Sequence, residues 1–202
     1  MKRPFLGTDF FTRDVLEVAR DLVGVELVWH GCSGIIVETE AYAVEGDPAC
    51  HTASRPGARE FVRRKPPGAA YVYFNYGMYW LFNLHVKGGS RDGLILIRAL
   101  EPASGVEMMK IRRRKNKLHE LCSGPGKLAL ALDIHGEHHG TPMAGRGKPA
   151  GCGLRPTDRI PRAGVVSDVR VGISQAVDFM WRFLAKDSPY LSVKFGKVKP
   201  PK

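Results

Sequence analysis

The clearest hydrophobic pattern in the chain is the alternation over residues 35–42, which predicts a β-strand. Successive side chains of a strand point to opposite faces. One face therefore carries Ile35, Val37, Thr39 and Ala41, and the other carries Ile36, Glu38, Glu40 and Tyr42. Glu38 and Glu40 are neighbours, about 7 Å apart along the strand. Two carboxylates at this spacing repel each other unless a cation lies between them or one is protonated. The alternative is that this face is open to solvent.

The remaining elements follow from similar patterns and from turn residues. Strands are expected at residues 25–29, 34–42, 68–76, 80–85, 94–100 and 190–193. Helices are expected at residues 8–23 and 102–114, a further helix is expected to open at Ser123–Lys127 ahead of the apolar run 128–132, and a helix or turn is expected at 171–184. Thr12 is the expected cap of the first helix, and Pro102 lies in the first turn of the second. Residues 43–67 show no regular periodicity and are expected to form a long loop, which in a compact domain is often functional.

Length and composition fit one folded domain. The chain has 202 residues, 44% of them hydrophobic, which is enough for a substantial core. No linker or repeat divides the sequence, so residues 1–202 are expected to form a single domain with a basic tail from about residue 194. No apolar run approaches the roughly 18 residues that a membrane span requires. The expected fold class is α+β, a single mixed α/β domain with a curved, mainly antiparallel sheet.

Cysteines and histidines give no pattern typical of a disulfide framework or a metal site. The four cysteines, at positions 32, 50, 122 and 152, are far apart and form no CxxC pair, so free thiols are favoured over disulfides. His135, His138 and His139 lie close together without a second ligand cluster at a recognised spacing. The sequence therefore predicts no metal site.

Charge adds a second theme. Lysine and arginine outnumber aspartate and glutamate by 31 to 20, which gives a net charge of +11. Such a surplus favours an acidic partner, most commonly nucleic acid. Cations gather in residues 55–65 and 110–117, and both runs are candidates for phosphate contacts. A solvated charged loop remains the alternative for the first. Ser123–Lys127 opens a helix whose free N–H groups suit an anion.

Two polar residues interrupt apolar strands. Arg98 ends the buried run of residues 94–100 and must be paired if it is desolvated. Glu38 and Glu40 are the obvious partners, either as part of a catalytic site or as a purely structural ion pair. Asn83 interrupts the strand of residues 80–85 and must find buried partners or meet a ligand. A buried aromatic core is the alternative explanation for the tyrosines that surround it in sequence.

Six segments, in this order and spacing, resemble the alkyladenine (3-methyladenine) DNA glycosylase family of purine DNA glycosylases. They are VETEAY from Val37, ACH from Ala49, YVYFNYGMY from Tyr71, LILIRALEP from Leu94, LCSGPGKL from Leu121 and RVGI from Arg170. Each segment alone is a weak signal, but the set is highly specific. The resemblance extends from about residue 16 to residue 192.

The resemblance implies a cofactor-free enzyme that flips a damaged purine out of duplex DNA and hydrolyses its N-glycosidic bond. The lesions implied are 3-methyladenine and 7-methylguanine, with ethenoadenine and hypoxanthine as open candidates. Glu40 matches the general base that activates water, Arg98 matches the arginine near that water, and Glu38 would be structural. The protein would be monofunctional, since no lysine interrupts these strands to form a Schiff base.

The other matches are binding residues. Tyr42, His51 and Tyr73 match the walls of the base pocket, Asn83 matches the residue that clashes with the amine of normal guanine, and the backbone of Val171 matches a contact to the flipped base. Tyr76 matches the residue that intercalates into the duplex from a protruding β-hairpin. Further DNA contacts are expected from Met78, Tyr79, Arg63, Arg64, Lys65 and Lys127.

The expected partner is double-stranded DNA containing a damaged purine, bound by a monomer that does not associate with membranes. The expected location is the cytoplasm, at the nucleoid in a bacterium, or the nucleus in a eukaryote. Two other functions fit the residues. A non-catalytic nucleic-acid-binding module would use Glu40 only as the partner of Arg98. A small-molecule hydrolase would use Glu38 and Glu40 as a pair and would turn over without DNA.

Overall fold

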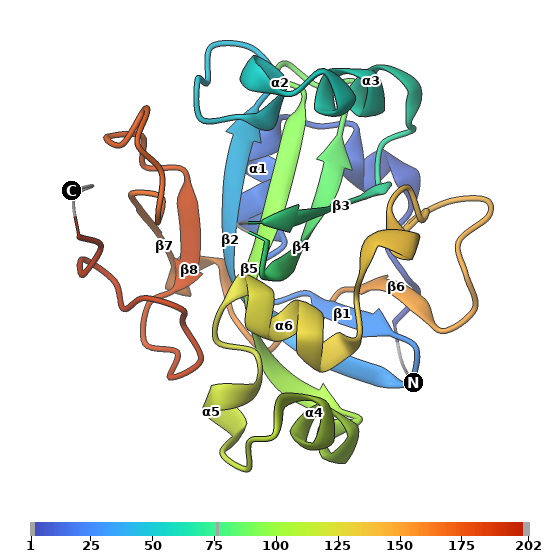
Figure 1. Ribbon diagram of the computed structural model, residues 1–202, viewed down its shortest axis with the longest axis vertical. Coiled ribbons are helices and arrows are strands. Elements are labelled where there is room, and N and C mark those ends of the chain that lie inside the picture. The colour runs from blue at the N-terminus through green and yellow to red at the C-terminus, as the bar shows by residue number, and fades with distance from the viewer. Residues whose placement is uncertain (1–2, 76, 200–202) are drawn as a thin grey trace.

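The structure, a computed structural model, describes residues 3–75 and 77–199 and forms one mixed α/β domain around an antiparallel sheet (Figure 1). The strands are β1 (Glu26–Trp29), β2 (Cys32–Ala43), β3 (Ala70–Asn75), β4 (Tyr79–Val86), β5 (Gly93–Ser104), β6 (Cys152–Arg155), β7 (Val165–Asp168) and β8 (Arg182–Ala185). Their order is β3-β4-β5-β2-β1-β6, and β8 pairs with both β2 and β7. The α+β fold class is confirmed.

Six α-helices and three short 3₁₀ turns connect the strands in the part of the chain that the structure describes. The helices are α1 (Val15–Asp21), α2 (His51–Ser54), α3 (Pro56–Arg64), α4 (Val106–Arg113), α5 (Leu118–Leu121) and α6 (Pro125–Leu132). The 3₁₀ turns are η1 (Thr8–Phe11), η2 (Gly136–His138) and η3 (Arg162–Gly164). Among the described residues, no helix is long and apolar enough to cross a membrane.

The first predicted helix is divided in two. Residues 8–11 form the 3₁₀ turn η1, and α1 begins only at Val15. Thr12 does not cap α1, because its hydroxyl donates to the Asp9 carbonyl at 2.9 Å. The cap is Asp14, whose Oδ1 accepts the Leu16 N–H at 2.9 Å. Aspartate is a strong helix cap because its carboxylate accepts the otherwise unpaired N–H groups of the first turn.

The expectation of a long loop over residues 43–67 is wrong, because α2 and α3 lie within it. Pro56 occupies the first turn of α3, where its missing N–H costs nothing. Ala58 and Phe61 are buried on one face of the helix. The charged residues that made the segment look like a loop occupy the opposite, solvated face, as in any amphipathic helix.

The helix predicted over residues 102–114 also starts later than expected. Strand β5 continues through Pro102, which pairs with Gly34 of β2, as far as Ser104. Gly105 then adopts a left-handed conformation with φ of 69°, and α4 begins at Val106. The added Cβ of any other residue at position 105 would lie 2.6 Å from Cys32 Sγ, so glycine is required for the reversal at this point.

Of the two alternatives for residues 171–184, the helix is wrong: the Phe179 N–H closes a turn on the Ala176 carbonyl at 3.3 Å, and strand β8 begins at Arg182. Residues 171–181 form neither helix nor strand, and the aromatic residues Phe179 and Trp181 pack around a buried arginine instead of forming a helical stripe. Residues 190–193 form no strand. The basic tail is tied to the domain at Gly196, whose N–H donates to Asp168 Oδ2 at 2.9 Å.

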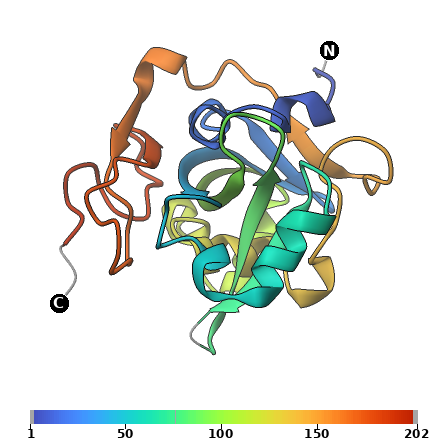
Figure 2. The same ribbon diagram turned by 90° about the horizontal axis from the view of Figure 1, so that it is seen from above.

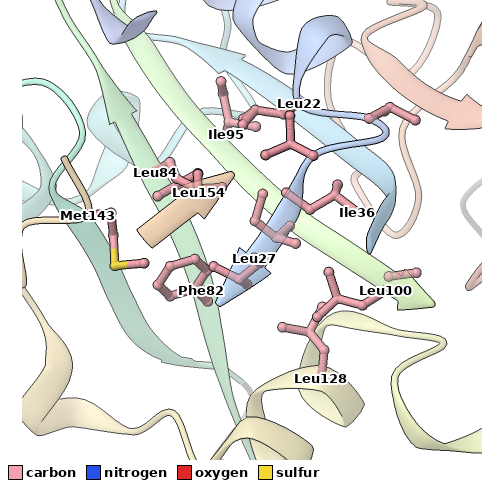
Figure 3. Packing of buried hydrophobic residues seen from close by; sticks show 14 of the residues in the cluster. Leu22, Leu27, Ile36, Phe82, Leu84, Ile95, Leu100, Leu128, Met143 and Leu154 are labelled. Atoms are coloured by element: carbon pink, nitrogen blue, oxygen red, sulfur yellow. The ribbon is translucent and has the colours of Figure 1, made fainter. Parts of the chain in front are cut away.

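A large hydrophobic core holds most of these elements together, and a smaller cluster under α3 contains Ala58, Phe61, Ala69, Tyr71 and Leu94. Strands and helices contribute fully buried aliphatic and aromatic side chains that meet in the centre of the molecule, among them Leu22, Leu27, Ile36, Phe82, Leu84 and Ile95 (Figure 3). All four cysteines are buried free thiols, as their spacing predicted. The long strands β2 and β5 cross this core side by side, so the polar residues placed on them have fixed positions (Figure 1).

Candidate active site

A cavity of about 410 Å³ opens between the sheet, α2 and the segment that precedes β8. Its size lies in the range of small-molecule and base-binding pockets. All five residues predicted to bind the base line this cavity, namely Tyr42, His51, Tyr73, Asn83 and Val171. Arg98 lines it as well, together with Tyr71, Asn75, Leu81, Leu94 and Leu96. The structure therefore brings together residues that are up to 129 positions apart in the chain.

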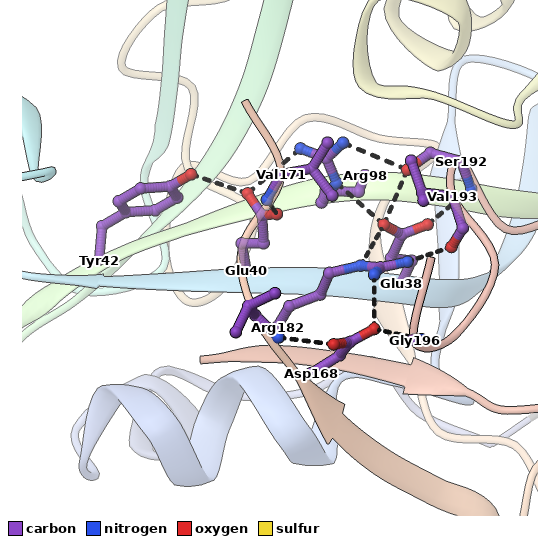
Figure 4. Close-up of polar contacts among 11 residues, drawn as sticks. Glu38, Glu40, Tyr42, Arg98, Asp168, Val171, Arg182, Ser192, Val193 and Gly196 are labelled. Atoms are coloured by element: carbon purple, nitrogen blue, oxygen red, sulfur yellow. Dashed lines mark hydrogen bonds and ion pairs between the residues drawn. The ribbon is translucent and has the colours of Figure 1, made fainter. Parts of the chain in front are cut away.

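Glu40 lies directly behind the wall of this cavity, with a side chain that is 0% exposed (Figure 4). Its Oε2 accepts the Tyr42 hydroxyl at 2.7 Å and Arg98 Nη1 at 3.2 Å. Its Oε1 accepts the backbone N–H of Val171 at 2.7 Å. A carboxylate offers about four acceptor sites, so these three bonds leave room for a further donor.

Glu38 is held by a separate set of donors on the same side of β2. Arg98 Nε and Arg182 Nε donate to its Oε1 at 2.9 and 2.8 Å. Ser192 donates its hydroxyl to Oε1 at 2.8 Å and its N–H to Oε2 at 2.7 Å (Figure 4). Burial alone would raise the pKa of Glu38, but the two guanidinium groups and Ser192 bring that pKa below its usual value. Glu38 is therefore an anion at neutral pH that accepts four hydrogen bonds from protein donors, three at Oε1 and one at Oε2.

Arg98 connects the two carboxylates. The alternative that Glu38 and Glu40 face solvent is wrong, and the prediction that Arg98 pairs with them is confirmed. Burial alone would lower the pKa of Arg98, but the Glu40 and Glu38 carboxylates raise it above its usual value. One cation between two anions removes the repulsion that their spacing would otherwise create.

Tyr42 lines the cavity and also contacts Glu40. Burial and the neighbouring Glu40 charge raise the pKa of Tyr42 well above its usual value. The phenol therefore stays protonated and donates its hydrogen to the carboxylate, while the ring faces the cavity. This bond fixes the ring, because a tyrosine has only two rotatable side-chain bonds.

His51 and Tyr73 form the opposite part of the wall, with ring centroids 4.3 Å apart in an edge-to-face arrangement. His51 Nδ1 lies 3.3 Å from the Tyr71 hydroxyl. Burial and the Arg55 cation lower the pKa of His51 to about 4. At neutral pH the imidazole is therefore uncharged, so the wall combines electron-rich rings without an added positive charge from histidine.

Asn83 is buried at the floor of the cavity, where Nδ2 donates to the Tyr71 carbonyl at 3.1 Å. The expectation that this buried amide finds a partner is confirmed, and the residue also lines the cavity. Its orientation is fixed by pairing of β3 with β4, in which Asn83 stands opposite Tyr71.

Comparison with known proteins agrees with this geometry. A family model for methylpurine-DNA glycosylase (MPG) matches residues 9–189. A protein of Rhodopseudomonas palustris (strain HaA2) named "Putative 3-methyladenine DNA glycosylase" is 43% identical over 95% of this chain and 92% of its own length. Proteins with the same name in Agrobacterium fabrum (strain C58) and Chlorobaculum tepidum (strain TLS) are 42% and 39% identical; they cover 95% and 100% of this chain and 94% and 96% of their own lengths. This chain belongs to the methylpurine-DNA glycosylase family. The resemblance inferred from six segments is therefore confirmed.

In this methylpurine-DNA glycosylase family member, the residues expected to contact DNA come from the β3–β4 hairpin, the end of α3 and the first turn of α6. Met78 and Tyr79 are 63% and 50% exposed at the end of the β3–β4 hairpin, which projects at the lower edge of Figure 2. Tyr76, the expected intercalating residue, lies outside the residues that the structure describes. Arg63 and Arg64 are exposed at the end of α3, and both pair with Glu60. Lys65 and Lys127 are exposed too, and Lys127 Nζ lies 3.4 Å from Ser123 Oγ.

Half of the six cations in the second basic run, residues 110–117, are engaged within the protein, whereas Arg114, Lys115 and Lys117 are exposed. Arg112 donates to the Ala131 carbonyl at 3.1 Å, and Arg113 donates to the Leu121 carbonyl at 3.0 Å. Lys110 pairs with Glu107 at 2.7 Å. The two arginine bonds satisfy carbonyls near the C-terminal ends of neighbouring helices. They explain this part of the basic run without a contact to phosphate.

Three polar residues of the cavity lining in this glycosylase family member, Tyr71, Asn75 and Arg55, were not among the residues predicted to bind the base. Tyr71 and Asn75 share a strand face with Tyr73, so the alternation of β3 could have identified them. Arg55 lies at the rim with its guanidinium 5.4 Å from the Tyr73 ring centroid. No local signal marks Arg55, because its place depends on the packing of α2 and α3 against β3.

No group of three or more His, Cys, Asp or Glu side chains that could hold a metal ion occurs within residues 3–75 and 77–199. The histidines near residue 135 have other partners. His138 Nδ1 accepts the His135 N–H at 3.1 Å, and His139 Nδ1 lies 2.8 Å from the Val72 carbonyl. These contacts join the irregular segment to its own turn and to β3.

Proposed function

We propose that this protein hydrolyses the N-glycosidic bond of alkylated or otherwise damaged purines in duplex DNA and leaves an abasic site. The observation that carries the proposal is a fully buried carboxylate, Glu40, placed behind an aromatic cavity by three hydrogen-bond donors. Lesions with a cationic base, such as 3-methyladenine and 7-methylguanine, are the first expected substrates. Ethenoadenine and hypoxanthine are further candidates, but as neutral bases they must be protonated before they can leave.

Glu40 would act as the general base. Its remaining acceptor site can receive a proton from a water at the cavity wall, and its charge stabilises the sugar as it becomes oxocarbenium-like. Arg98 and the Val171 N–H keep the carboxylate in place and direct it toward the cavity. Glu38, which accepts four bonds from protein donors and does not line the cavity, would hold Arg98 and take no part in the chemistry.

The neutral rings of Tyr42, His51 and Tyr73 would select the base. Aromatic faces attract cations and electron-poor rings, and a neutral His51 adds no repulsion. A purine can reach these rings only if its nucleotide leaves the duplex, which costs a few kcal/mol and less for a damaged base. Intercalation of Tyr76 into the resulting gap remains a prediction from family resemblance, as do contacts of Met78 and Tyr79 with DNA.

The reaction is proposed to stop at base removal. A lyase step needs an amine that attacks the sugar as a Schiff base, and none of the described residues that line the cavity is a lysine. The relatives named above are bacterial, so we place the proposed activity on cytoplasmic, nucleoid DNA. A single copy of the chain contains all of the proposed machinery.

The decisive experiment is single-turnover excision from duplex oligonucleotides that each carry one lesion. Glu40→Gln should lower the excision rate by about 10²- to 10⁴-fold, the usual contribution of a general base, while the affinity for the duplex is retained. Glu101→Gln, which removes a carboxylate from β5 far from the cavity lining, is the matched control and should keep the wild-type rate. Full activity of Glu40→Gln would remove the catalytic assignment. Absence of excision by the wild-type protein would favour a binding module, and turnover of free nucleosides would favour a small-molecule hydrolase.

A further inference from the structure

A second buried ion pair lies behind the cavity and does not line it. Arg170 and Asp47 are both 0% exposed at their side chains. Arg170 donates from Nη1 to Asp47 Oδ2 at 2.6 Å and from Nη2 to Asp47 Oδ1 at 2.9 Å. This is a bidentate arrangement, which is the strongest and most directional form of an arginine–carboxylate pair. It joins segments that are 123 residues apart.

Each member of the pair also binds the backbone beside a cavity residue. Arg170 Nη1 donates to the Ala41 carbonyl at 3.0 Å, next to Tyr42. Asp47 accepts the Ala43 N–H at 3.2 Å, on the other side of Tyr42, and the Ala49 N–H at 3.1 Å, just before α2 and His51. The backbone on both sides of Tyr42 and the start of the His51 helix are therefore fixed to one ion pair.

The guanidinium of Arg170 also packs against the ring of Tyr42. Its Cζ lies 4.6 Å from the Tyr42 ring centroid and 5.2 Å from that of Trp181. Cation–π contacts with these rings add to the stabilisation that the Asp47 carboxylate gives the buried guanidinium of Arg170. The same residue is directly followed by Val171, whose N–H donates to Glu40 at 2.7 Å.

We propose that Asp47 and Arg170 are positioning residues for the reaction at Glu40. The pair holds two of the three donors to the Glu40 carboxylate, the Tyr42 hydroxyl and the Val171 N–H, in one rigid arrangement. It acts through these groups and does not itself touch the base or the sugar. The inference rests on the function proposed above, because it assigns the pair to the same site.

The chemistry explains why such a pair is needed. Val171 belongs to a segment without helix or strand, so no regular hydrogen-bond ladder fixes the direction of its N–H. A buried charge left without its partner is costly, and that cost holds the segment in a single position. Misplacement of a catalytic group by about 1 Å can reduce a rate by about 100-fold.

Two variants test the inference, so that the test remains possible if one of them fails to fold. Asp47→Asn removes the charge and one strong acceptor, and Arg170→Lys keeps the cation but loses the bidentate geometry. In both, the single-turnover excision rate is expected to fall by about 10- to 100-fold. Affinity for undamaged duplex is expected to stay within about two-fold, because neither residue lies on the exposed basic surface.

Two further measurements separate positioning from a loss of stability. Hydrogen exchange of the Val171 amide should become faster by about 10-fold or more in a folded variant that lacks the Asp47–Arg170 ion pair. The pH–rate profile of excision should differ from that of the wild type, because the variants disturb the Val171 N–H bond to the carboxylate of the proposed general base. Glu26→Gln is the matched control. It breaks the ion pair between Glu26 on β1 and Arg155 on β6, whose side chain is 15% exposed. This variant should be less stable than the wild type but should not change the Val171 exchange or the pH–rate profile.

The possible outcomes are distinct. If the wild-type protein excises lesions, and Asp47→Asn and Arg170→Lys both keep its rate, pH profile and Val171 exchange, the inference is wrong and the proposed function stands. If the variants lose activity only in proportion to their unfolded fraction, as the Glu26→Gln control would, the pair is structural and the inference again fails. If the wild-type protein excises no lesion, the proposed function fails first, and exchange at Val171 still reports whether the pair fixes this segment.

Discussion

At the scale of single residues, the site depends on which acceptors and donors remain free. Glu38 and Glu40 lie two positions apart on one strand, yet Glu38 is surrounded by Arg98, Arg182 and Ser192 while Glu40 lies against cavity residues. The pKa of Glu38 is lowered, so its contribution to stability is present above its unfolded pKa and is lost as the pH falls through its folded pKa.

His51 provides a prediction at this scale. Its pKa falls from 6.5 to about 4 on folding, so between these values the unfolded chain binds a proton that the folded chain does not. The free energy of unfolding should therefore decrease as the pH is lowered from 6.5 towards 4. In His51→Gln this component is absent, and the decrease between pH 7 and pH 4.5, measured by urea unfolding, should be smaller than in wild type.

His119→Gln serves as the control for that comparison, because His119 lies exposed on α5. It should retain the wild-type dependence on pH. An equal decrease in wild type and His51→Gln would contradict the assignment of a neutral His51. The imidazole should also add no limb to the pH–rate profile of excision between pH 5 and 8.

At the scale of elements, the position of α6 against the β3–β4 hairpin is set by a single glycine. A Cβ added at Gly126 would lie 2.8 Å from the Tyr79 Cβ and Cγ atoms, which is closer than packed side chains tolerate. The absence of a side chain lets the N-terminal turn of α6, with Pro125 in the cavity wall, approach the exposed end of β4. Helix and hairpin thereby form one surface beside the cavity.

Gly126→Ala should consequently destabilise the protein by about 1–3 kcal/mol, the usual cost of overpacking, and should weaken binding to duplex DNA by displacing Tyr79. Thermal unfolding and DNA titration measure the two effects. Gly57→Ala in α3 is the matched substitution, since its added Cβ meets nothing within 4 Å. That variant should gain about 0.4–1 kcal/mol through the unfolded state. Equal stability of the two variants would show that the contact with Tyr79 is easily relieved.

At the scale of the whole molecule, the cations that give the net charge of +11 differ in how far they are already bound within the protein. Arg112 and Arg113 bind carbonyls, and Arg63 and Arg64 share Glu60, whereas Lys65 and Lys127 are exposed. In the view of Figure 2, the hairpin end and α3 lie along the lower part of the molecule, away from η3. This arrangement is consistent with one face that follows a phosphate backbone.

Salt dependence tests that arrangement. The logarithm of the association constant should fall linearly with the logarithm of salt concentration, with a slope of about −0.9 for each phosphate neutralised. Lys65→Gln and Lys127→Gln should each reduce the magnitude of the slope by about 1. Arg162→Gln, in η3 and paired with Asp21, should leave the slope unchanged. Equal slopes in all variants would mean that these lysines do not contact DNA phosphates.

The sequence by itself determined strands β1 to β5 and the face of β2 that carries the glutamates, but it missed β6, β7 and β8. Alternation placed Glu38, Glu40 and Tyr42 on one surface because the pleat of a strand repeats every two residues. A buried charge must be paired, so Arg98 could be assigned to the two glutamates before their contact was seen. The same reasoning missed α2 and α3, since their charged faces resembled a loop, and it misplaced the first cap, because Asp14 and Thr12 are both acceptable caps.

Only the tertiary structure decided how the two glutamates differ. Ser192 and Arg182 occupy the acceptors of Glu38, and the Val171 N–H and Tyr42 hydroxyl orient Glu40. The pairing of Asp47 with Arg170 was equally invisible along the chain. Local patterns fix which way a side chain points, because backbone geometry repeats over a few residues. Which distant donor reaches a given carboxylate depends on how separate segments pack in the folded domain, and no periodicity records that.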